Sequence, residues 1–530
     1  MSSPRKPTRT AAPNELPSPE AHAAHYAALV ARDARFDGRF FVGVTSTGIY
    51  CRPVCRVRTP KAANCLFFDH AAAAEQAGFR PCLRCRPERA PGQAPIDASL
   101  RLAWAAAQRI QAGELDEHGM EGLAARLGIT DRHLRRVFSD AFGVSPIDYA
   151  QTQRLLMAKR LLADTSLPVT EVALAAGFGS LRRFNTLFQE RYGLAPSQLR
   201  RNMLVSHAPA NDKAGSNDMA TIADATSSLR FELGYRPPLD WPRLLAFLSK
   251  RCIAGVEQVD GLAYRRTVRV GQGPLAPTGW LEVTQADGRD ALAVRVSAGL
   301  LRALPAVLAG MRRLFDLDCD PQAVGAVLGD LAADAPGLRV PGAFDGFEMS
   351  VRAVLGQQVT VRAAHTLAGR LAAALGEPLP TPFAALTHLF PTARRVADAS
   401  ADEIGSLGIV RQRVGAIQAL AREVADGRLD LGPAADVEAT MAQLEALPGI
   451  GRWTARYIAL RALGWPDAWP SGDIALHKAL GVSKAAQADA IAEAWSPWRG
   501  YATLHLWRRL SEGLPTPPSP STPPATGARS

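Results

Sequence analysis

Two short-spaced pairs of cysteines constrain this chain more than any other feature. Cys51 and Cys55 are separated by three residues and Cys82 and Cys85 by two, with a 26-residue gap between the pairs. Each pair can close a tight loop that presents two sulfurs, and this spacing is typical of four cysteine ligands around one Zn²⁺. Paired disulfides are the alternative, and they would require an oxidising compartment. Cys65 has no partner nearby in the sequence, so we expect a small buried residue there.

The surroundings of the cysteines are strongly basic, which favours a nucleic-acid backbone as the partner of this segment. Six arginines accompany the predicted ligands: Arg52, Arg56, Arg58, Arg80, Arg84 and Arg86. Residues 1–205 carry 28 Lys and Arg against 18 Asp and Glu, whereas the remainder is near neutral, with 33 against 32. We therefore expect the first part to supply most of the long-range attraction to DNA. A finger with a purely structural ion would also explain the spacing.

The segments GIYCRPVCRVR and AGFRPCLRC resemble the N-terminal domain of the Ada family of bacterial alkylation-response proteins. The resemblance implies that a zinc-bound cysteine, here Cys51, accepts a methyl group from a methyl phosphotriester in DNA. It also implies phosphate contacts from Thr47, Arg58 and Arg80. Four thiolates leave the zinc site negative, which repels intact phosphodiesters but admits the neutral methylated ester. Transfer removes one negative charge from the DNA-facing surface, so it can switch DNA binding as well as repair the lesion.

A helical region with an internal repeat follows the cysteines. Residues 96–202 have helical periodicity throughout, and they contain two copies of one pattern about fifty residues apart. Each copy has a helix of small residues (122–127 and 172–176), a turn with Gly, an N-cap at Thr130 or Ser180, and an Arg-rich helix. This order predicts a helix-turn-helix, twice.

The two Arg-rich helices carry the side chains that suit base edges and phosphates. Leu134, Val137 and Phe138 are predicted to face the core. The residues predicted to face DNA are Arg132, His133, Arg135, Arg136, Arg182, Arg183 and Asn185. An ordinary helical hairpin with a solvated basic face is the alternative. The segment GFGSLRRFNTLFQERYGLAPSQLR resembles AraC-type transcription regulators, which implies two successive major-groove contacts with promoter DNA.

The rest of the chain is predicted to begin as a small α+β unit and to continue as helices. Strands are expected at 229–235, 264–270, 279–285 and 291–297, with a helix at 241–252 among them.

Leu447-Pro-Gly449-Ile-Gly451 is a tight turn between helices, whose backbone N–H groups can hold a DNA phosphate. With Trp-Thr-Ala after it and an Asp about twenty residues later, this segment resembles helix-hairpin-helix DNA glycosylases of the AlkA type. The resemblance extends from about Leu229 to Glu512 and includes FEMSVRAVLGQQV.

Asp473 is the predicted catalytic acid of that glycosylase. Its position in SGDIALHKAL also suits an N-cap, and Asp467 is a local rival that lies too early relative to the motif. A 3-alkylated purine already carries positive charge and leaves readily. The enzyme therefore has mainly to stabilise the cation that develops at the sugar C1′ and to guide water to it. An ionised Asp473 in a dry pocket suits the first of these tasks.

The resemblance also implies a base pocket and a loop that enters the duplex. Trp453 and Tyr457 share one helix face and, with Trp507, match an aromatic pocket that stacks a flipped cationic base, although aromatics at this spacing are commonly core residues. Gln357 and Gln358 match the loop that enters the duplex. Two residues depart from the AlkA pattern: Gln358 stands where the wedge is Leu, and Ile474 stands where a Tyr follows the acid.

The absence of several sequence motifs excludes some activities and cell locations from the prediction. No Lys stands after the hairpin, where lyase-active glycosylases carry one, so a monofunctional enzyme is expected. No four-cysteine cluster follows for an iron–sulfur centre, and the Pro-Cys-His-Arg motif of O6-alkylguanine methyltransferases is missing. No apolar run is long enough for a membrane span, and the first residues lack the apolar core of a secretion signal. Together with seven cysteines of which four stand in a metal-binding pattern, this favours a reducing cytoplasm.

The sequence thus predicts a multidomain chain: a small zinc-bound α/β domain, an all-α double helix-turn-helix domain, and an α+β plus mainly α helix-hairpin-helix glycosylase. The expected boundaries are 1–20 disordered, 21–90 zinc, 96–205 helix-turn-helix, 206–228 linker, 229–300 α+β, 301–512 glycosylase and 513–530 disordered. We expect a monomer that binds damaged and promoter double-stranded DNA and contacts RNA polymerase. One rival is a regulator with structural zinc and a non-catalytic DNA clamp, and another is a glycosylase for oxidised or deaminated bases.

Overall fold

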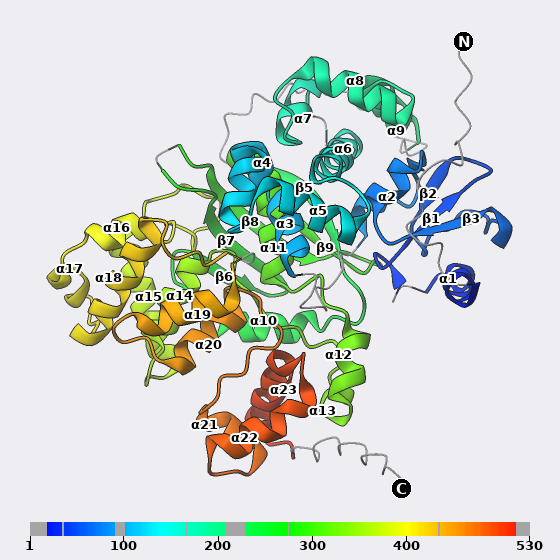
Figure 1. Ribbon diagram of the computed structural model, residues 1–530. Coiled ribbons are helices and arrows are strands. Elements are labelled where there is room, and N and C mark those ends of the chain that lie inside the picture. Colours follow the sequence, from blue (N-terminus) through cyan, green and yellow to red (C-terminus); the bar gives the residue numbers. More distant parts are fainter. Residues whose placement is uncertain are drawn as a thin grey trace, which may run out of the picture. The chain divides into compact units, whose positions relative to one another are not determined.

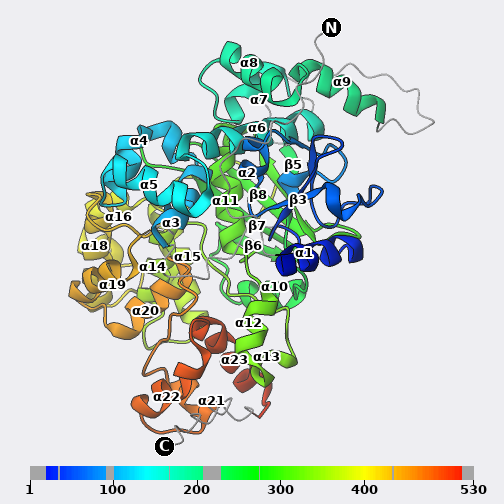
Figure 2. The same ribbon diagram turned by 45° about the vertical axis from the view of Figure 1, so that its right-hand side comes forward.

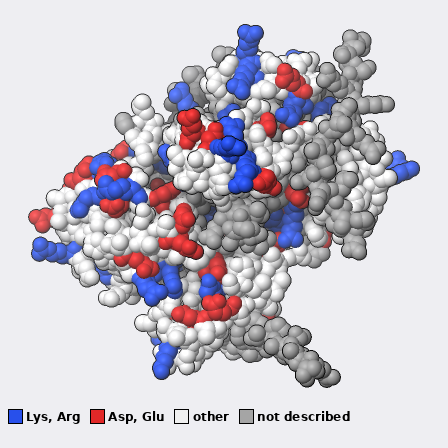
Figure 3. Space-filling view, viewed as in Figure 1, with Lys and Arg blue, Asp and Glu red and all other residues white. Residues whose placement is uncertain are grey.

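The structure is a computed structural model that describes residues 19–33, 36–90, 101–165, 167–206, 228–273, 275–432 and 435–515. The chain divides into two compact units, each assembled from separate stretches of sequence. Unit 1 comprises residues 1–236, 263–312 and 378–389, and unit 2 comprises 237–262, 313–377 and 390–530. No helix among the described residues is long and apolar enough to cross a membrane. On the face drawn in Figure 3, basic and acidic side chains are interspersed.

The first part of unit 1 is a small α/β module, here called the cysteine module (19–90). Its elements are α1 (Pro19–Ala31), β1 (Phe41–Val44), β2 (Ile49–Cys51), η2 (Ala62–Asn64), β3 (Cys65–Phe68), α2 (Ala71–Gln76), β4 (Arg80–Pro81) and η3 (Pro87–Arg89). The sheet order is β3-β1-β2-β4, antiparallel except for the parallel pair β2 and β4. Phe40, Val42 and Tyr50 are buried around it, and Cys65 is buried as expected. Because α1 begins at Pro19, the last two residues of the segment predicted as disordered are helical.

The second part of unit 1 is helical and confirms the duplicated helix-turn-helix (Figure 1). Its helices are α3 (Arg101–Gln111), α4 (Glu114–Arg126), α5 (Asp131–Phe142), α6 (Pro146–Asp164), α7 (Val169–Ala175), α8 (Leu181–Tyr192) and α9 (Pro196–Ser206). Thr130 and Ser180 cap α5 and α8 by accepting a backbone N–H three residues on. Gly143 and Gly193 end the same helices at φ of 69° and 71°, a region that favours glycine. The two copies of the sequence repeat therefore have the same type of N-cap and the same glycine C-cap on their second helix.

An antiparallel sheet forms the third part of unit 1. Its elements in this unit are β5 (Ser228–Gly234), β7 (Ala263–Arg269), β8 (Thr278–Gln285), β9 (Ala291–Ser297) and η5 (Ala298–Ala303), with most of α11 (Leu304–Leu314). The strands follow the order β5-β9-β8-β7, and Leu281, Val283, Val294 and Val296 are fully buried between them. These strands match the predicted ones to within one residue at each end. The linker predicted between the helices and this sheet is described only at Ser206 and Ser228, which belong to α9 and β5.

Unit 2 consists mainly of helices around two cores. Its elements are α10 (Trp241–Ser249), β6 (Glu257–Asp260), α12 (Pro321–Leu328), α13 (Asp330–Ala333), α14 (Gly346–Leu355), α15 (Val361–Leu375), α16 (Ala393–Asp398), α17 (Ala401–Gly405), α18 (Arg411–Ala425), α19 (Val437–Ala446), α20 (Arg452–Arg461), α21 (Ile474–Leu480), α22 (Ala485–Ala492), η6 (Glu493–Trp495) and α23 (Arg499–Glu512). Both ribbon views show α21, α22 and α23 grouped together, and α16 beside α18, which Figure 1 shows together with α17 (Figures 1 and 2). Helix α20 serves both cores, because Ile458 enters one and Leu460 the other.

Two sequence predictions differ from unit 2. The helix expected at 241–252 is α10, which ends at Ser249 because the chain turns there and sends Ile253 and Val256 into the core. Strand β6 was not predicted, since EQVD is short and lacks an alternation of apolar and polar residues.

Candidate functional sites

The two cysteine pairs converge on one point in the cysteine module. Parallel pairing of β2 with β4 aligns Tyr50 with Pro81, so the next residues along each strand, Cys51 and Cys82, come side by side. The tight turns that follow return Cys55 and Cys85 to the same place. The Sγ atoms of the four cysteines all lie within 4.8 Å of one another. This donor set fits one tetrahedral Zn²⁺, as the sequence predicted, and the described cysteines are all free of disulfides.

The four sulfurs differ in the backbone hydrogen bonds that they accept. The Arg52 N–H donates to Cys85 Sγ at 3.3 Å, and the Cys85 N–H donates to Cys82 Sγ at 3.5 Å. The neighbouring Cys51 lowers the pKa of Cys55, and the Val57 backbone contributes in the same direction to a smaller extent. Among the hydrogen bonds of the described residues, none runs from a backbone N–H to Cys51 Sγ. Cys51 therefore lacks the backbone N–H donors that Cys82 and Cys85 have.

The arginines around the cysteines fall into two groups. Arg52 is bound to both carboxylate oxygens of Asp37, and Arg86 is paired with Glu88 and Asp164. The interpretation of these two arginines as part of the basic surroundings that bind a nucleic-acid backbone is therefore wrong, because their guanidinium groups bind carboxylates within the protein. The remaining basic side chains and the predicted phosphate-contacting threonine are exposed: Thr47, Arg56, Arg58, Arg80 and Arg84.

A buried ion pair connects the cysteine module to helix α6. Lys159 of α6 has no exposed surface, and its Nζ lies 2.8 Å from Glu88 Oε2. The same ammonium donates to the backbone carbonyl of Cys82 at 3.3 Å. Burial raises the pKa of Glu88, but Lys159 and Arg86 outweigh it and hold that pKa at about 2. A metal ligand and the central helix of the helix-turn-helix region thus share one polar contact, which the sequence did not predict.

The predicted recognition residues lie on α5 and α8. Leu134 and Phe138 are buried and Val137 is half-buried, which confirms the predicted core face of α5. Arg132, Arg136, Arg182, Arg183 and Asn185 are exposed, whereas His133 and Arg135 are half-buried. The Arg135 guanidinium binds Asp131 at 2.8 Å, and Arg136 lies 3.3 Å from His133 Nδ1.

In unit 2, three helices bring Asp473 together with two of the predicted pocket residues. Asp473 caps α21, where its Oδ1 accepts the Leu476 N–H at 3.0 Å. The Trp453 indole of α20 donates to Oδ2 at 2.9 Å, and the Trp507 indole of α23 donates to Oδ1 at 3.3 Å. The residue is thus an N-cap, and both its oxygens also accept hydrogen bonds from the predicted pocket. Its rival Asp467 is occupied elsewhere, in contacts with Arg499.

The three predicted aromatic residues form one surface. Trp453 and Tyr457 are stacked, with ring centroids 5.3 Å apart and an interplanar angle of 5°, and the ring of Trp507 lies 6.3 Å from that of Tyr457. Behind them, buried Arg461 donates to the Tyr457 hydroxyl at 2.8 Å. Although burial raises the pKa of Tyr457, Arg461 and Arg251 bring it below its usual value.

Helix α10 and the turn that follows it add residues that the sequence analysis missed. The guanidinium of Arg251 lies 3.7 Å from the centroid of the Phe247 ring, and that of Arg461 lies 5.1 Å from it. Phe247 thus joins the aromatic cluster through Arg461. The apolar periodicity of LDWPRLLAFL marks a helix but does not indicate which neighbour its half-buried Phe contacts. Ile474, the residue after the acid, is 70% exposed.

The predicted DNA-entering loop and the hairpin contact each other. The Gln357 side chain donates to the Gly449 carbonyl at 2.9 Å and to Thr454 Oγ1 at 3.0 Å, so it braces the hairpin. Gln358 is exposed, with φ of 52°, a left-handed conformation that costs a residue with a side chain about 1–2 kcal/mol. Gly449 has φ of 79°, and a Cβ there would lie 3.0 Å from Ala416. Gly451 is the N-cap of α20.

Four family models match successive parts of the chain. They are the metal binding domain of Ada (residues 24–88), a helix-turn-helix domain (123–202), the AlkA N-terminal domain (230–345) and the HhH-GPD superfamily of base excision DNA repair proteins (351–490). The predicted zinc ligands and Asp473 fall inside the first and the last of these matches.

Curated relatives match either nearly the whole chain or one part of it. A probable bifunctional transcriptional activator/DNA repair enzyme AlkA of Mycobacterium tuberculosis is 40% identical over 495 residues, 92% of this chain and 96% of the relative. The Escherichia coli DNA-3-methyladenine glycosylase 2 is 40% identical over 277 residues, 52% of this chain and 96% of the relative. The Bacillus subtilis bifunctional transcriptional activator/DNA repair enzyme AdaA is 31% identical over 175 residues, 33% of this chain and 80% of the relative.

Proposed function

The chain belongs to the family of bifunctional transcriptional activator/DNA repair enzymes, and on that premise we propose which residues carry each activity. The cysteine module is a single-turnover methyl acceptor for DNA methylphosphotriesters. The helix-turn-helix region binds promoter DNA and becomes an activator after methylation. Unit 2 is a monofunctional glycosylase that releases 3-methyladenine and related alkylated bases by hydrolysis.

We assign methyl transfer to Cys51. Bound Zn²⁺ keeps the sulfur as a thiolate. The thiolate attacks the methyl carbon, an S–C bond forms, the C–O bond breaks, and the electron pair leaves with the phosphate as an ordinary phosphodiester. An N–H donor draws electron density from sulfur, and Cys51 lacks the backbone donors that serve Cys82 and Cys85. This difference supports Cys51 as a stronger nucleophile than Cys82 or Cys85. Exposed Arg58 and Arg80 would bind the flanking phosphates.

We assign base excision to Asp473. The alkylated base stacks on Trp453, Tyr457 and Trp507, and its cationic ring is attracted to their π faces. As the C1′–N bond breaks, its electron pair neutralises the base, and the Asp473 carboxylate stabilises the sugar cation until water adds. Gln358 enters the duplex, and the hairpin with Gly449 holds a phosphate through backbone N–H groups. The observation that carries this assignment is that two indoles from separate helices donate to opposite oxygens of one carboxylate.

The test of this assignment compares two Asp→Asn variants in the full chain. Asn caps helices as well as Asp does, so Asp473→Asn is expected to fold and bind DNA while losing release of 3-methyladenine from methylated DNA. Asp436→Asn changes an exposed cap of α19 and should leave release unchanged. If the wild type releases no alkylated base, unit 2 is a DNA clamp. If Asp473→Asn still releases it at the wild-type rate, another residue is the catalytic group.

The remaining proposals concern cell location and assembly. The described cysteines are free, which fits a reducing cytoplasm. We propose that the chain acts as a monomer on double-stranded DNA and contacts RNA polymerase when it activates transcription.

The assignment of methyl transfer to Cys51 is tested with DNA that carries labelled methyl groups on its phosphates. The label should appear on Cys51. If Cys51→Ala still takes up the label, another of the zinc ligands is the methyl acceptor.

A further inference from the structure

The segment that carries Asp473 differs from the helices that carry its two indole partners. Residues 462–473 connect α20 to α21, and this range contains no helix or strand. Gly472, directly before the acid, has φ of 84°, and a Cβ added there would meet no atom within 4 Å, so close packing does not hold the chain at this point. The position of Asp473 therefore depends on α21, a helix of only 7 residues, and on contacts made earlier in the loop.

One carboxylate on α22 makes those earlier contacts. Asp489 Oδ1 accepts the indole N–H of Trp469 at 2.9 Å, and Oδ2 accepts the hydroxyl of Ser471 at 2.8 Å. Trp469 is only 4% exposed, so its indole N–H depends on an acceptor within the protein. From α20, Arg456 donates to the Trp469 carbonyl at 3.3 Å. The residues just before Asp473 are thus tied to two helices.

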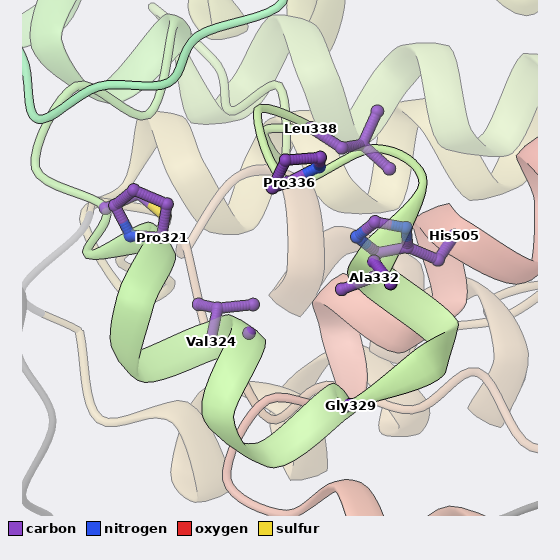
Figure 4. A pocket seen from close by; sticks show the side chains of 10 residues that line it. Pro321, Val324, Gly329, Ala332, Pro336, Leu338 and His505 are labelled. Atoms are coloured by element: carbon purple, nitrogen blue, oxygen red, sulfur yellow. The ribbon is translucent and has the colours of Figure 1, made fainter.

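The helices that carry the indoles are fixed independently of this loop. Helix α20 contributes side chains to both cores of unit 2. Helix α23 is held by Arg508 and Arg509, which both pair with Asp334 at the end of α13. Figure 4 shows the imidazole of His505 of α23 near Ala332 of α13, where both line a cavity. The indoles therefore keep their places when the loop moves, and the loop sets where the carboxylate stands between them.

We propose that Asp489 is a positioning residue for base release: by holding Trp469 and Ser471, it keeps the Asp473 carboxylate between its two indole donors. In this role Asp489 acts only through the loop and does not touch the substrate, so the inference rests on the proposed assignment of Asp473. A displacement of about 1 Å can slow a reaction by about 100-fold, so a contact outside the pocket can control the rate. Two rival roles for Asp489, a direct effect of its negative charge and a purely structural effect on unit 2, make different predictions.

Two substitutions of Asp489 separate hydrogen bonding from charge. An indole can only donate a hydrogen bond, whereas a hydroxyl can donate or accept one. In Asp489→Asn the side-chain oxygen can therefore face Trp469 while the amide donates to Ser471, so both contacts remain although the charge is lost. Asp489→Ala removes both contacts.

The measurement is single-turnover release of 3-methyladenine by the full chain, with protein in saturating excess over methylated DNA. Asp489→Ala should lower the rate constant by roughly tenfold or more. Asp489→Asn should stay within about threefold of the wild type, since hydrogen bonds between neutral groups are weaker than those to a charge. At saturating protein the rate constant does not depend on the fraction that is folded, so a purely structural role would not change it.

Asp467→Ala is the matched control, because it makes the same change earlier in the same loop, where Asp467 binds Arg499 and Ser496. It should lower the temperature of thermal unfolding and leave the rate constant unchanged. Ser471→Ala is a milder variant that removes one of the two contacts of Asp489. It should slow release less than Asp489→Ala does, and the two changes together should slow release no further than Asp489→Ala alone.

Three results would overturn the inference and leave the assignment of Asp473 standing. They are a wild-type rate constant in Asp489→Ala and Ser471→Ala, an Asp489→Asn variant as slow as Asp489→Ala, and an Asp467→Ala variant that slows release equally. If the wild type releases no alkylated base, or if Asp473→Asn releases it at the wild-type rate, the proposed function fails and the role of Asp489 fails with it.

Discussion

At the scale of single residues, the Asp473 carboxylate is held by three donors from three helices. Two are indole N–H groups and one is the backbone of α21. A carboxylate with this many fixed acceptor contacts cannot rotate, so it presents its charge in one direction. In a partly desolvated site, such a fixed charge stabilises a developing cation without first reorganising.

Trp507→Phe removes one of these donors and keeps most of the ring. A hydrogen bond to a charged group is worth about 1.5–3 kcal/mol, so single-turnover release of 3-methyladenine should slow by roughly tenfold or more. Trp495→Phe is the matched control, because that indole N–H is buried, has no hydrogen-bond partner among the described residues, and lies outside the proposed site. If both variants slow release equally, the loss comes from packing and the hydrogen bond to Asp473 does no chemical work.

Gln358 has a left-handed backbone conformation, which lowers the free energy of unfolding of the chain. Gln358→Gly should raise the free energy of unfolding by up to about 1 kcal/mol, because glycine adopts this conformation without a steric cost. The same change should weaken base release, since it removes the side chain proposed to enter the duplex. Gln358→Asn tolerates the conformation and keeps an amide, so it should retain more activity. Thermal unfolding and base release, measured on the same samples, separate strain from function.

At the scale of elements, helix α6 is more than a connection between the two helix-turn-helix copies. The buried Lys159 ammonium donates a hydrogen bond to the backbone carbonyl of Cys82, a predicted zinc ligand. Arg86 forms an ion pair with Asp164 at the end of α6. Loss of the thiolate charge at the metal would therefore act on groups that also hold α6. This would give the proposed methylation switch a short structural route in addition to the change in surface charge.

Lys159→Met tests that route. Removing one partner of a buried ion pair costs about 3–5 kcal/mol, so unit 1 should unfold at lower denaturant concentration at pH 7. Glu88 has its pKa lowered, so its contribution is present above its ordinary pKa of 4.5 and is lost as pH falls toward 2. The variant should lose part of this acid sensitivity. Arg135→Met, which breaks an exposed pair on α5, should change stability by less than about 1 kcal/mol.

The sequence predicted elements better than contacts, for a physical reason. Capping residues such as Thr130, Ser180 and Asp473 accept a hydrogen bond from the first turn of their own helix. A short stretch of sequence is therefore enough to predict them. The same holds for the cysteine pairs, whose tight spacing fixes two ligands at a time. Arg52 and Arg86 were misplaced because Asp37 and Asp164, which bind them, lie 15 and 78 residues away in the sequence, although Arg86 also pairs with nearby Glu88. Nothing in a local pattern tells an arginine that binds phosphate from one that binds a buried carboxylate.

At the scale of the whole molecule, the two proposed chemistries use separate parts of the chain. The four cysteines belong to unit 1, and Asp473 and the aromatic residues around it belong to unit 2. The positive charge is equally uneven, since residues 1–205 hold nearly all of the net excess. DNA binding by unit 1 should therefore depend more steeply on salt than binding by unit 2.

Removal of zinc should separate the two activities. A structural four-cysteine site contributes its binding energy to folding, so a chelator should unfold the cysteine module and end methyl transfer and promoter binding. Release of 3-methyladenine should persist, because every residue assigned to it lies in unit 2 and none is a zinc ligand. Metal content, methyl transfer and base release are measured on one preparation of the full chain. Cys65→Ala is the control: it removes a buried cysteine outside the cluster, so one zinc per chain should remain. Base release that falls in step with the metal would show that the glycosylase depends on the zinc module.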